Sequence, residues 1–282
     1  MNVTILGASG FIGKYLASAL AARGDHVTTA SLRDPENAAR VAGASDAVVN
    51  LAGEPVAQRW SPEVKAKIRS SRVDAGAAFL DALAKQPRKP AAYVSASAVG
   101  YYGASETATF DESSGPGSDF LAGICVAWEA TADRAEALGM RVSKLRTGLV
   151  LGRDGGALAR LMPLFKFGLG GIVASGRQWY PWIHIDDQVG IYLHAIDGTA
   201  GVLDATAPNP VRNDEFTRAL GAALHRPPLF PAPAFAVALV LGEGASVVTE
   251  GQRVLPTRTL ATGYRFRYET IDAALGAIAA TA

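Results

Sequence analysis

The chain has 282 residues, enough to bury a large hydrophobic core in one or two domains. Hydrophobic residues make up 49% of it and charged residues 19%, which is typical of a globular protein and excludes a disordered one. A formal net charge of +1 argues against a surface that neutralises phosphates, so we expect no nucleic-acid partner.

The single cysteine and the longest apolar run indicate the kind of compartment in which the protein is expected. Cys125 has no second cysteine to pair with, which fits a reducing compartment. The N-terminus lacks the basic region and apolar stretch of a signal peptide. The apolar run at residues 234–241 is far shorter than the roughly 20 residues of a membrane span. We therefore expect a cytoplasmic protein that does not enter a membrane.

The first fifty residues read as strand, loop, helix and strand. A β-rich run at residues 3–6 precedes a glycine loop, and apolar residues then recur at helical spacing until Gly24. A second strand is predicted at 26–31. The apolar run at 46–51 is typical of a buried strand in a parallel sheet.

Strands and helices continue to alternate up to residue 151. One long helix is predicted over 61–85, because a serine, a proline and an acidic residue open it in capping order. Strands are predicted at 91–95 and 141–151, on either side of a helix at 119–138. This alternation predicts an α/β fold with a Rossmann-like, doubly wound parallel sheet.

Beyond Gly152 the chain becomes rich in glycine and loops. A strand at 183–185 and a helix capped by Asp186 and Asp187 are predicted, followed by helices at 213–224 and 271–279. We expect an interleaved organisation with a smaller C-terminal subdomain on the substrate side. The dinucleotide-binding domain takes residues 1–151 and 183–203, and the substrate-side subdomain takes residues 152–182 and 204–282.

The glycine loop carries the clearest chemical signal. Glycines permit a tight turn and a close approach of the backbone to a pyrophosphate, which the N–H groups of the following helix attract. The strand, loop, helix and strand around it are the context that a dinucleotide site requires, although a tight structural turn is the alternative. The expected cofactor-binding residues here are Gly7, Ser9, Gly10, Phe11, Ile12 and Gly13.

The residues after the second strand bear on which dinucleotide binds. An NAD site usually places an acid there for the ribose 2′-hydroxyl, whereas this chain has Arg33. A guanidinium suits a 2′-phosphate, so we expect NADP(H) in preference to NAD(H). Asp34 beside it, or a merely exposed Arg33, is the opposing interpretation. Only twelve residues separate Arg33 from Asp46, which leaves room for one short helix and predicts a shortened sheet edge and an open adenine pocket.

Seven ordered segments together resemble one large family. The sequence is similar to the extended or atypical short-chain dehydrogenase/reductase superfamily, in the epimerase family branch (NAD-dependent epimerase/dehydratase-like, with its C-terminal domain). The matching segments are residues 7–13, 49–55, 95–103, 119–123 with Trp128 and Glu129, 145–148, 182–187 and 251–256. The resemblance implies that Leu51, Ala52, Gly53 and Ser95 also contact the cofactor.

The same resemblance implies a serine and a Tyr-x-x-x-Lys pair for hydride transfer, of which only the serine is present. Ser97 stands at the serine position. Counted back from Glu129, the tyrosine position holds Leu121 and the lysine position holds Cys125. Leucine moves no proton and a thiol is no permanent cation, so the usual acid–base mechanism is missing.

Other residues are candidates for the missing chemistry. Tyr101 or Tyr102 would face the nicotinamide, or else both pack at the mouth of the cleft. Arg72 replaces a family asparagine and either reaches the site or is satisfied by Asp74 and solvent. Cys125 itself fits a small buried hydrophobe.

The substrate side is marked by cations, aromatic rings and one histidine. A surface or packing role competes with a binding role for each of them, and no cluster has metal-ligand spacing, so no metal is expected. The candidates are Arg146, Trp179, His184 and Arg253. We expect an NADP(H)-dependent oxidoreductase or epimerase-like enzyme, monomeric or homodimeric, that acts on a small carbonyl or sugar-derived substrate. The alternative is a non-catalytic NADP(H)-binding sensor or regulatory protein with a small-molecule effector.

Overall fold

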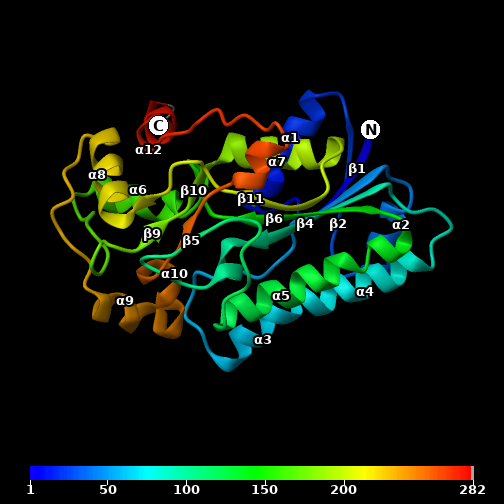
Figure 1. Cartoon of the computed structure of the whole chain (residues 1–282), viewed down its shortest axis with the longest axis horizontal. Helices are drawn as coiled ribbons and strands as arrows, with labels where there is room; N and C mark the ends of the chain where they lie inside the picture. The colour runs from blue at the N-terminus through cyan, green and yellow to red at the C-terminus, as the bar shows by residue number, and fades with distance from the viewer. Residues whose placement is uncertain (281–282) are drawn as a thin grey trace.

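The computed structural model describes residues 1–280 and is built around one six-stranded parallel sheet (Figure 1). The strand order is β11-β6-β4-β3-β1-β2. All neighbouring strands run parallel, so their carboxyl ends meet at one edge. The strands are β1 (Asn2–Leu6), β2 (His26–Ala30), β3 (Ala47–Asn50), β4 (Ala92–Ala98), β6 (Arg141–Thr147) and β11 (Gly201–Ala205). The doubly wound sheet predicted from the sequence is confirmed.

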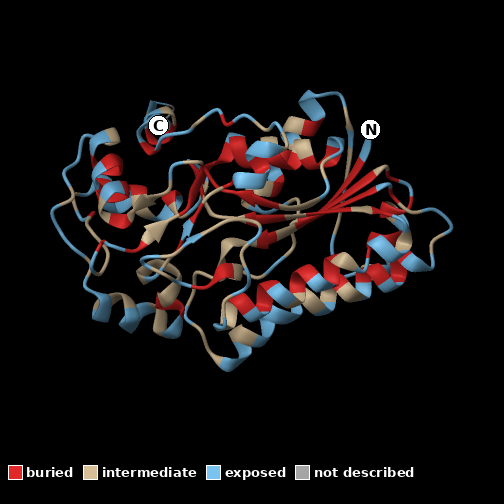
Figure 2. Cartoon of the chain, in the orientation of Figure 1, coloured by how far each residue is buried: buried red, intermediate tan, exposed pale blue. Residues whose placement is uncertain are grey.

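Helices cover both faces of this sheet. On one face α1 (Phe11–Ala22) and α7 (Ile185–Asp197) pack together, and on the other lie α2 (Pro35–Ala42), α4 (Val73–Ala84) and α5 (Phe120–Asp133). Figure 2 shows the buried residues concentrated along the strands and on the sheet-facing sides of these helices. The two layers bury separate apolar clusters, one on each face.

The sheet ends at β2, because the segment that follows holds only a short helix. Asp34 caps α2 by accepting a hydrogen bond from the Asn37 N–H at 3.1 Å. The chain then returns directly to β3, on the far side of β1. Among the described residues no strand pairs with the outer edge of β2, which confirms the shortened edge predicted after Arg33.

The C-terminal part forms a third apolar cluster beside the sheet. Residues of α6 (Leu158–Lys166), α8 (Asn213–Ala223) and α12 (Ile271–Ala280) pack around the buried ring of Trp182. The remaining elements are short: η1 (Val99–Tyr102), β5 (Thr109–Phe110), α3 (Pro62–Ser70), η2 (Glu136–Leu138), β7 (Leu149–Gly152), β8 (Gly155–Gly156), β9 (Trp179–Tyr180), β10 (Trp182–His184), β12 (Val211–Arg212), α9 (Ala234–Leu241), η3 (Gly242–Ala245), α10 (Ser246–Thr249), β13 (Arg253–Val254) and α11 (Thr257–Ala261).

Two predicted elements are each divided in two. The helix expected over 61–85 breaks between α3 and α4, where the Ser71 hydroxyl donates to the Ile68 carbonyl and accepts from the Glu54 N–H. The strand expected over 141–151 breaks at Gly148, against which the Pro181 carbonyl packs so closely that a Cβ has no room. Its second half, β7, pairs with β10 in a separate small sheet.

The cap of α7 also differs from the prediction. The helix begins at Ile185, so Asp186 and Asp187 lie in its first turn and His184 is the capping residue. The Nδ1 atom of His184 accepts a hydrogen bond from the Asp186 N–H at 3.1 Å. Burial lowers the pKa of the His184 imidazole below its ordinary value; Asp186 opposes this shift and Arg267 adds to it.

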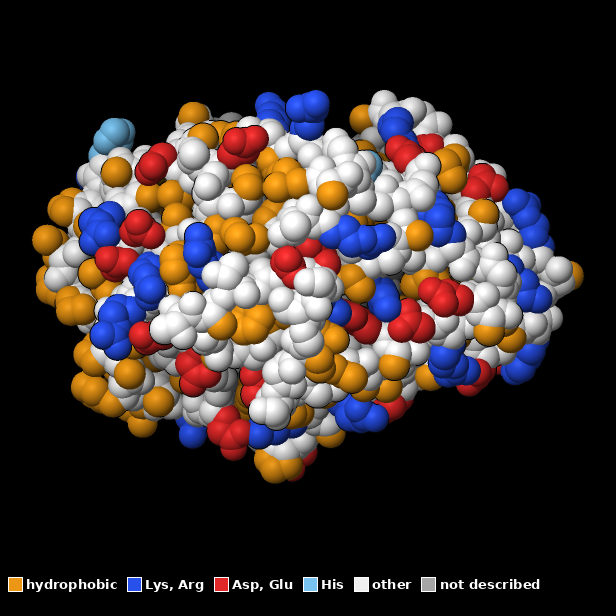
Figure 3. All heavy atoms as spheres, in the orientation of Figure 1, with side chains coloured by type: hydrophobic (Ala, Val, Ile, Leu, Met, Phe, Trp, Pro, Cys, Tyr) orange, Lys and Arg blue, Asp and Glu red, His pale blue; other side chains and the backbone are white. Residues whose placement is uncertain are grey.

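The outer surface carries both signs of charge and also exposes apolar residues, among them those of one helix. Figure 3 shows acidic and basic side chains interspersed on the face in view. Helix α9 is built of apolar residues, none of which is buried. No helix within residues 1–280 is long and apolar enough to cross a membrane.

We predict that His184 makes the protein less stable in acid. The folded chain holds His184 neutral, so the unfolded chain binds more protons as the pH falls through the ordinary histidine pKa of 6.5. The stability present above that pH is lost as the imidazole protonates. A His184→Asn variant keeps a capping side chain, so its melting temperature should fall less between about pH 7.5 and about pH 5.5 than that of the unmodified chain. Parallel slopes would contradict this prediction.

Candidate cofactor and active site

The glycine loop after β1 is closed to side chains. Gly7 has a φ of +85°, and a Cβ there would lie 2.9 Å from the Ala52 backbone nitrogen. A Cβ at Gly13 would lie 2.6 Å from the Gly7 carbonyl oxygen. Gly10 caps α1 without a side chain, which leaves the first N–H groups of that helix uncapped. The loop therefore fits a pyrophosphate drawn close to the backbone.

The other residues of the loop face outward or support it. Ser9 is exposed, whereas Phe11 and Ile12 are half-buried and pack on the cluster shared by α1 and α7. The Phe11 ring lies against Gly152 and leaves no space for a Cβ there. The β7–β8 hairpin thus covers the start of α1.

Arg33 lies exposed just beyond the end of β2, at one end of the carboxyl edge of the sheet. Its backbone N–H donates to the Ser31 hydroxyl at 3.3 Å. Its guanidinium makes no hydrogen bond or ion pair with the residues described, and Asp34 is engaged as the cap of α2. The Arg33 side chain is therefore available to a ligand at this edge.

The segment after β3 connects the glycine loop with the rest of the edge. Ala52 touches Gly7, and its N–H donates to the Asn50 side-chain oxygen at 3.1 Å. Leu51 is half-buried and Gly53 is exposed. Ser95, one strand further, is buried within β4, and its hydroxyl donates to the Ala96 carbonyl. Of these residues, 51–53 stand beside the loop, whereas Ser95 has its side chain inside the sheet layer.

Ser97 belongs to a buried charge network. Its hydroxyl donates to Glu129 Oε1 on α5 at 2.7 Å. Arg146 of β6 reaches the same carboxylate with two bonds, Nε to Oε1 at 2.8 Å and a terminal nitrogen to Oε2 at 2.9 Å. All three side chains are buried. This bond uses the Ser97 hydroxyl proton, which is then not available to a substrate oxygen.

Tyr102 extends the network to the last strand of the sheet. Its buried hydroxyl accepts from Arg146 at 3.0 Å and donates to the Asp204 carboxylate at 2.8 Å. Burial raises the pKa of the Tyr102 phenol far above its ordinary value, and Asp204 raises it further. Burial also raises the pKa of Asp204, helped by the nearby Glu112. Tyr102 is placed as a structural hydrogen-bond donor and is poorly suited to moving protons.

Tyr101 lies differently, although it is the next residue in the chain. It is half-buried, and the Arg146 guanidinium carbon lies 3.4 Å from the centre of its ring. Its ring packs edge-to-face on Tyr102. Its hydroxyl makes no hydrogen bond to the described residues, so this phenol remains free for a ligand.

The two replaced family positions meet the loop after β4. A Cβ on Gly100 would contact Leu121 at 3.4 Å and the Cys125 sulfur at 4.0 Å. Burial raises the pKa of the Cys125 thiol to about 12, and Glu129 adds to the rise. Cys125 is therefore an uncharged, buried thiol.

Arg72 reaches the same part of the edge from the break between α3 and α4. Its guanidinium packs against Gly53 and lies 5.0 Å from the centre of the Trp128 ring. It makes no ion pair within the described residues, and Asp74, in the first turn of α4, is exposed. The structure thus places the Arg72 guanidinium beside Gly53, in the segment after β3 that also contacts the glycine loop.

Two of the substrate-side candidates lie together, outside this cluster. The centre of the Trp179 ring lies 4.4 Å from the guanidinium carbon of Arg212 and 5.3 Å from that of Arg253. Its Nε1 donates to the Glu106 carbonyl at 3.0 Å. The adjoining Gln252 donates to the Val99 carbonyl of η1.

His184 and Arg146 are both buried and engaged by other residues of the chain. The His184 ring caps α7 and lies 3.9 Å from the centre of the Tyr268 ring. Arg146 is held by Glu129 and Tyr102. The expected substrate contacts through these two side chains stay predictions.

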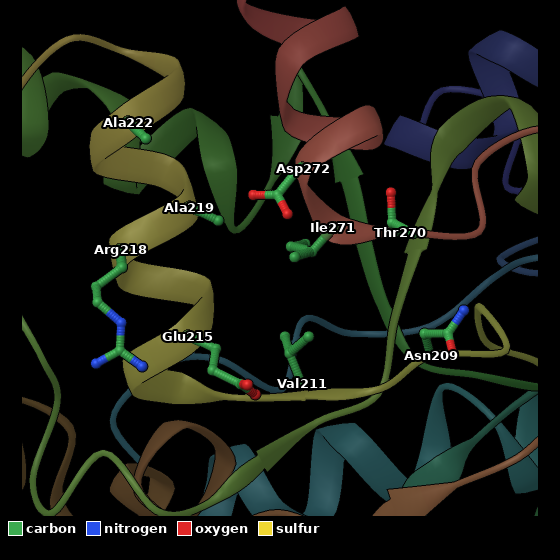
Figure 4. Close-up of a pocket in the computed structure, with 9 residues that line it drawn as sticks. All are labelled: Asn209, Val211, Glu215, Arg218, Ala219, Ala222, Thr270, Ile271 and Asp272. Atoms are coloured by element: carbon green, nitrogen blue, oxygen red, sulfur yellow. The ribbon is translucent and has the colours of Figure 1, made fainter.

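A surface hollow of about 550 Å³ lies between α8 and α12, away from the glycine loop (Figure 4). Its rim carries Arg218 and Glu215 from α8, and Asp272 from α12. Arg218 already pairs with Asp214 at 2.9 Å. No residue of the glycine loop or of the end of β4 lines this hollow, so it is separate from the candidate site.

Sequence reasoning missed the partners that hold the site. In the sequence, Glu129 only marks the point from which the tyrosine and lysine positions are counted. Asp204 and Gln252 have no role predicted from the sequence. A carboxylate among the apolar positions of a buried helix face, as in α5, is the signal that could have indicated a buried ion pair. Its partner lies 17 residues away on another element, which no local pattern reveals.

A parallel sheet in this order, with a glycine loop closed to side chains, defines a Rossmann-fold protein. The NAD dependent epimerase/dehydratase family model matches residues 3–204, and a domain of unknown function (DUF1731) matches residues 232–278. The chain therefore belongs to the NAD dependent epimerase/dehydratase family, as its resemblance predicted.

Relatives match over nearly the whole chain. It is 43% identical to the epimerase family protein SDR39U1 homolog, chloroplastic, of Arabidopsis thaliana, with 99% of this chain and 86% of the relative covered. It is 41% identical to the human epimerase family protein SDR39U1 over 99% of this chain and 100% of the relative. A crystal structure of the human protein (isoform 2) with NADPH superposes with a TM-score of 0.93 at 37% identity, covering 100% of both chains.

We predict that Glu129→Leu lowers the free energy of unfolding by about 3–5 kcal/mol, because it leaves the buried Arg146 charge unpaired. The double variant Glu129→Leu/Arg146→Met removes both charges and should recover part of that loss. Urea unfolding measures both. Glu136→Leu, at an exposed position near the end of the same segment, is the control. A single variant as stable as this control would refute the role of the pair.

Proposed function

We propose that this chain binds NADP(H) and is an oxidoreductase or epimerase-like enzyme acting on a small carbonyl or sugar-derived substrate. The observation that carries the proposal is the glycine loop, in which Gly7 and Gly13 leave no room for a Cβ beside the uncapped start of α1. The NADPH complex of the human relative supports this choice of cofactor.

The preference for NADP(H) over NAD(H) rests on Arg33. Its free guanidinium stands beyond β2, where the adenosine ribose of a dinucleotide lies when its pyrophosphate occupies the loop after β1. A guanidinium donates two parallel hydrogen bonds to a phosphate, which a ribose hydroxyl does not match. The short segment after Arg33 leaves the adenine side open, so the 2′-phosphate contact is a main source of affinity there.

Fluorescence titration with NADPH tests this assignment. Arg33→Ala should weaken NADPH binding about tenfold or more, the scale of a lost charge-assisted bidentate contact, and leave NADH binding nearly unchanged. Arg40→Ala is the matched control, because Arg40 is exposed on α2 and, within residues 1–280, its side chain bonds only to Asn37. If the unmodified chain binds no NADPH, the proposed function fails.

The proposed proton carrier is Tyr101. Bound NADPH supplies a hydride, so the protein has to deliver a proton to the substrate oxygen. Ser97 and Tyr102 are committed to Glu129 and Asp204, whereas the Tyr101 hydroxyl is free and its ring is fixed under Arg146. In this proposal Ser97 and Tyr102 hold the loop, and Tyr101 meets the substrate.

A panel of small aldehydes, ketones and nucleotide sugars, followed by NADPH oxidation, tests the activity. Tyr101→Phe should reduce kcat about 10²-fold or more while NADPH affinity stays the same, because only the proton donor is lost. Ala104→Ser, an exposed change in the same loop, is the control. Tight NADPH binding with no turnover of any panel member would favour the sensor or regulatory alternative.

A further inference from the structure

Arg72 owes its position to the break between α3 and α4. The Ser71 hydroxyl donates a hydrogen bond to the Ile68 carbonyl and accepts one from the Glu54 N–H. The second bond connects the break to the segment after β3. The Arg72 N–H bonds the Arg69 carbonyl, so the last turn of α3 tightens before α4 begins. This geometry turns the Arg72 side chain toward the carboxyl edge of the sheet instead of outward along a straight helix.

The guanidinium lies against the backbone of the segment after β3. A Cβ on Gly53 would come 2.8 Å from the guanidinium carbon and 2.9 Å from one terminal nitrogen. On its other side the Trp128 ring of α5 is 5.0 Å away. One terminal nitrogen donates to the Ile68 carbonyl at 3.2 Å. The group is therefore fixed in orientation by three different elements.

The charge of this guanidinium is not neutralised by a bonded carboxylate in residues 1–280. Burial lowers the pKa of Arg72, and Cys125 and Glu54 oppose this shift. Cys125 is a protonated thiol, and Glu54 does not bond the guanidinium. A guanidinium has five N–H donors and stays charged at neutral pH, so most of its hydrogen-bonding capacity remains for a ligand.

The sheet order assigns Arg72 to one half of the bound dinucleotide. A dinucleotide centred on the loop after β1 extends along the carboxyl edge in both directions. Arg33 marks the β2 side, which takes the adenosine half. Gly53 follows β3, and Cys125 and Trp128 belong to α5, which packs on η1 at the end of β4. Arg72 therefore lies on the opposite side, with the nicotinamide half.

We propose that the Arg72 guanidinium is the cation of the nicotinamide half of the site, where it donates to ribose hydroxyls and favours NADPH over NADP⁺. A fixed positive charge raises the free energy of the positively charged oxidised ring but not that of the neutral reduced ring. This inference rests on the proposed NADP(H) site and assigns Arg72 a positioning and electrostatic role within it.

Paired titrations with NADPH and NADP⁺ test the assignment, with NADP⁺ measured by displacement of NADPH. Arg72→Gln keeps a donor for the Ile68 carbonyl but removes the charge. It should weaken NADPH binding about tenfold and reduce the preference for NADPH over NADP⁺ about fivefold. Arg72→Lys keeps the charge and should retain most of that preference. Arg69→Gln removes an equal charge from an exposed position in the last turn of α3, just before the break, and is the matched control.

The ratio of the two affinities separates this role from a purely structural one. Damage to folding, or a contact with the pyrophosphate, would weaken both cofactors equally and leave the ratio unchanged. An equal loss, or an Arg72→Gln variant that matches Arg69→Gln, overturns the inference while the NADP(H) site stands. Arg72→Met, which still covers Trp128, serves as a second neutral variant if Arg72→Gln does not fold. A wild-type chain that binds neither cofactor overturns the proposed function itself.

Discussion

The bidentate ion pair between Glu129 and Arg146 is the interaction on which the candidate site depends. It joins α5 to β6 and fixes the hydroxyls of Ser97 and Tyr102, one on each side. Burying two charges carries a large desolvation cost, which only close geometry and additional hydrogen bonds offset. Here every partner is present, so the end of β4 and the loop after it are held rigidly.

This rigidity changes what the loop is able to do. In a site with a tyrosine and a lysine, mobile protons pass between side chains next to the cofactor. Here the corresponding space holds Leu121 and the protonated thiol of Cys125. Near this space, among the described residues, the Tyr101 hydroxyl and the Arg72 guanidinium keep free hydrogen-bonding capacity; they approach the edge from η1 and from the break before α4. The buried ion pair of the site is thus separate from the groups that remain free to bind a ligand.

Local patterns predicted the first part of the fold well. The glycine loop with its flanking strands and α1, and the single helix α2 before β3, follow from periodicity, glycine placement and segment length. The divisions at Ser71 and Gly148 were not predictable in the same way. The helix breaks at Ser71, where the Glu54 N–H donates a hydrogen bond to the Ser71 hydroxyl. The strand ends at Gly148, where the Pro181 carbonyl packs against the backbone. Both causes lie far away in the chain.

The sequence by itself determined the phosphate-binding loop, the parallel sheet and the absence of the usual tyrosine and lysine, because these depend on residue types at fixed local spacing. Only the tertiary structure decided which side chains are free to act. Ser97, Tyr102 and Arg146 carry suitable chemical groups, yet partners from other elements occupy each of them. Within residues 1–280, no partner bonds the Tyr101 hydroxyl, and the Arg72 guanidinium donates only to the Ile68 carbonyl, so both groups remain available. Availability is a property of long-range contacts, which local sequence patterns do not encode.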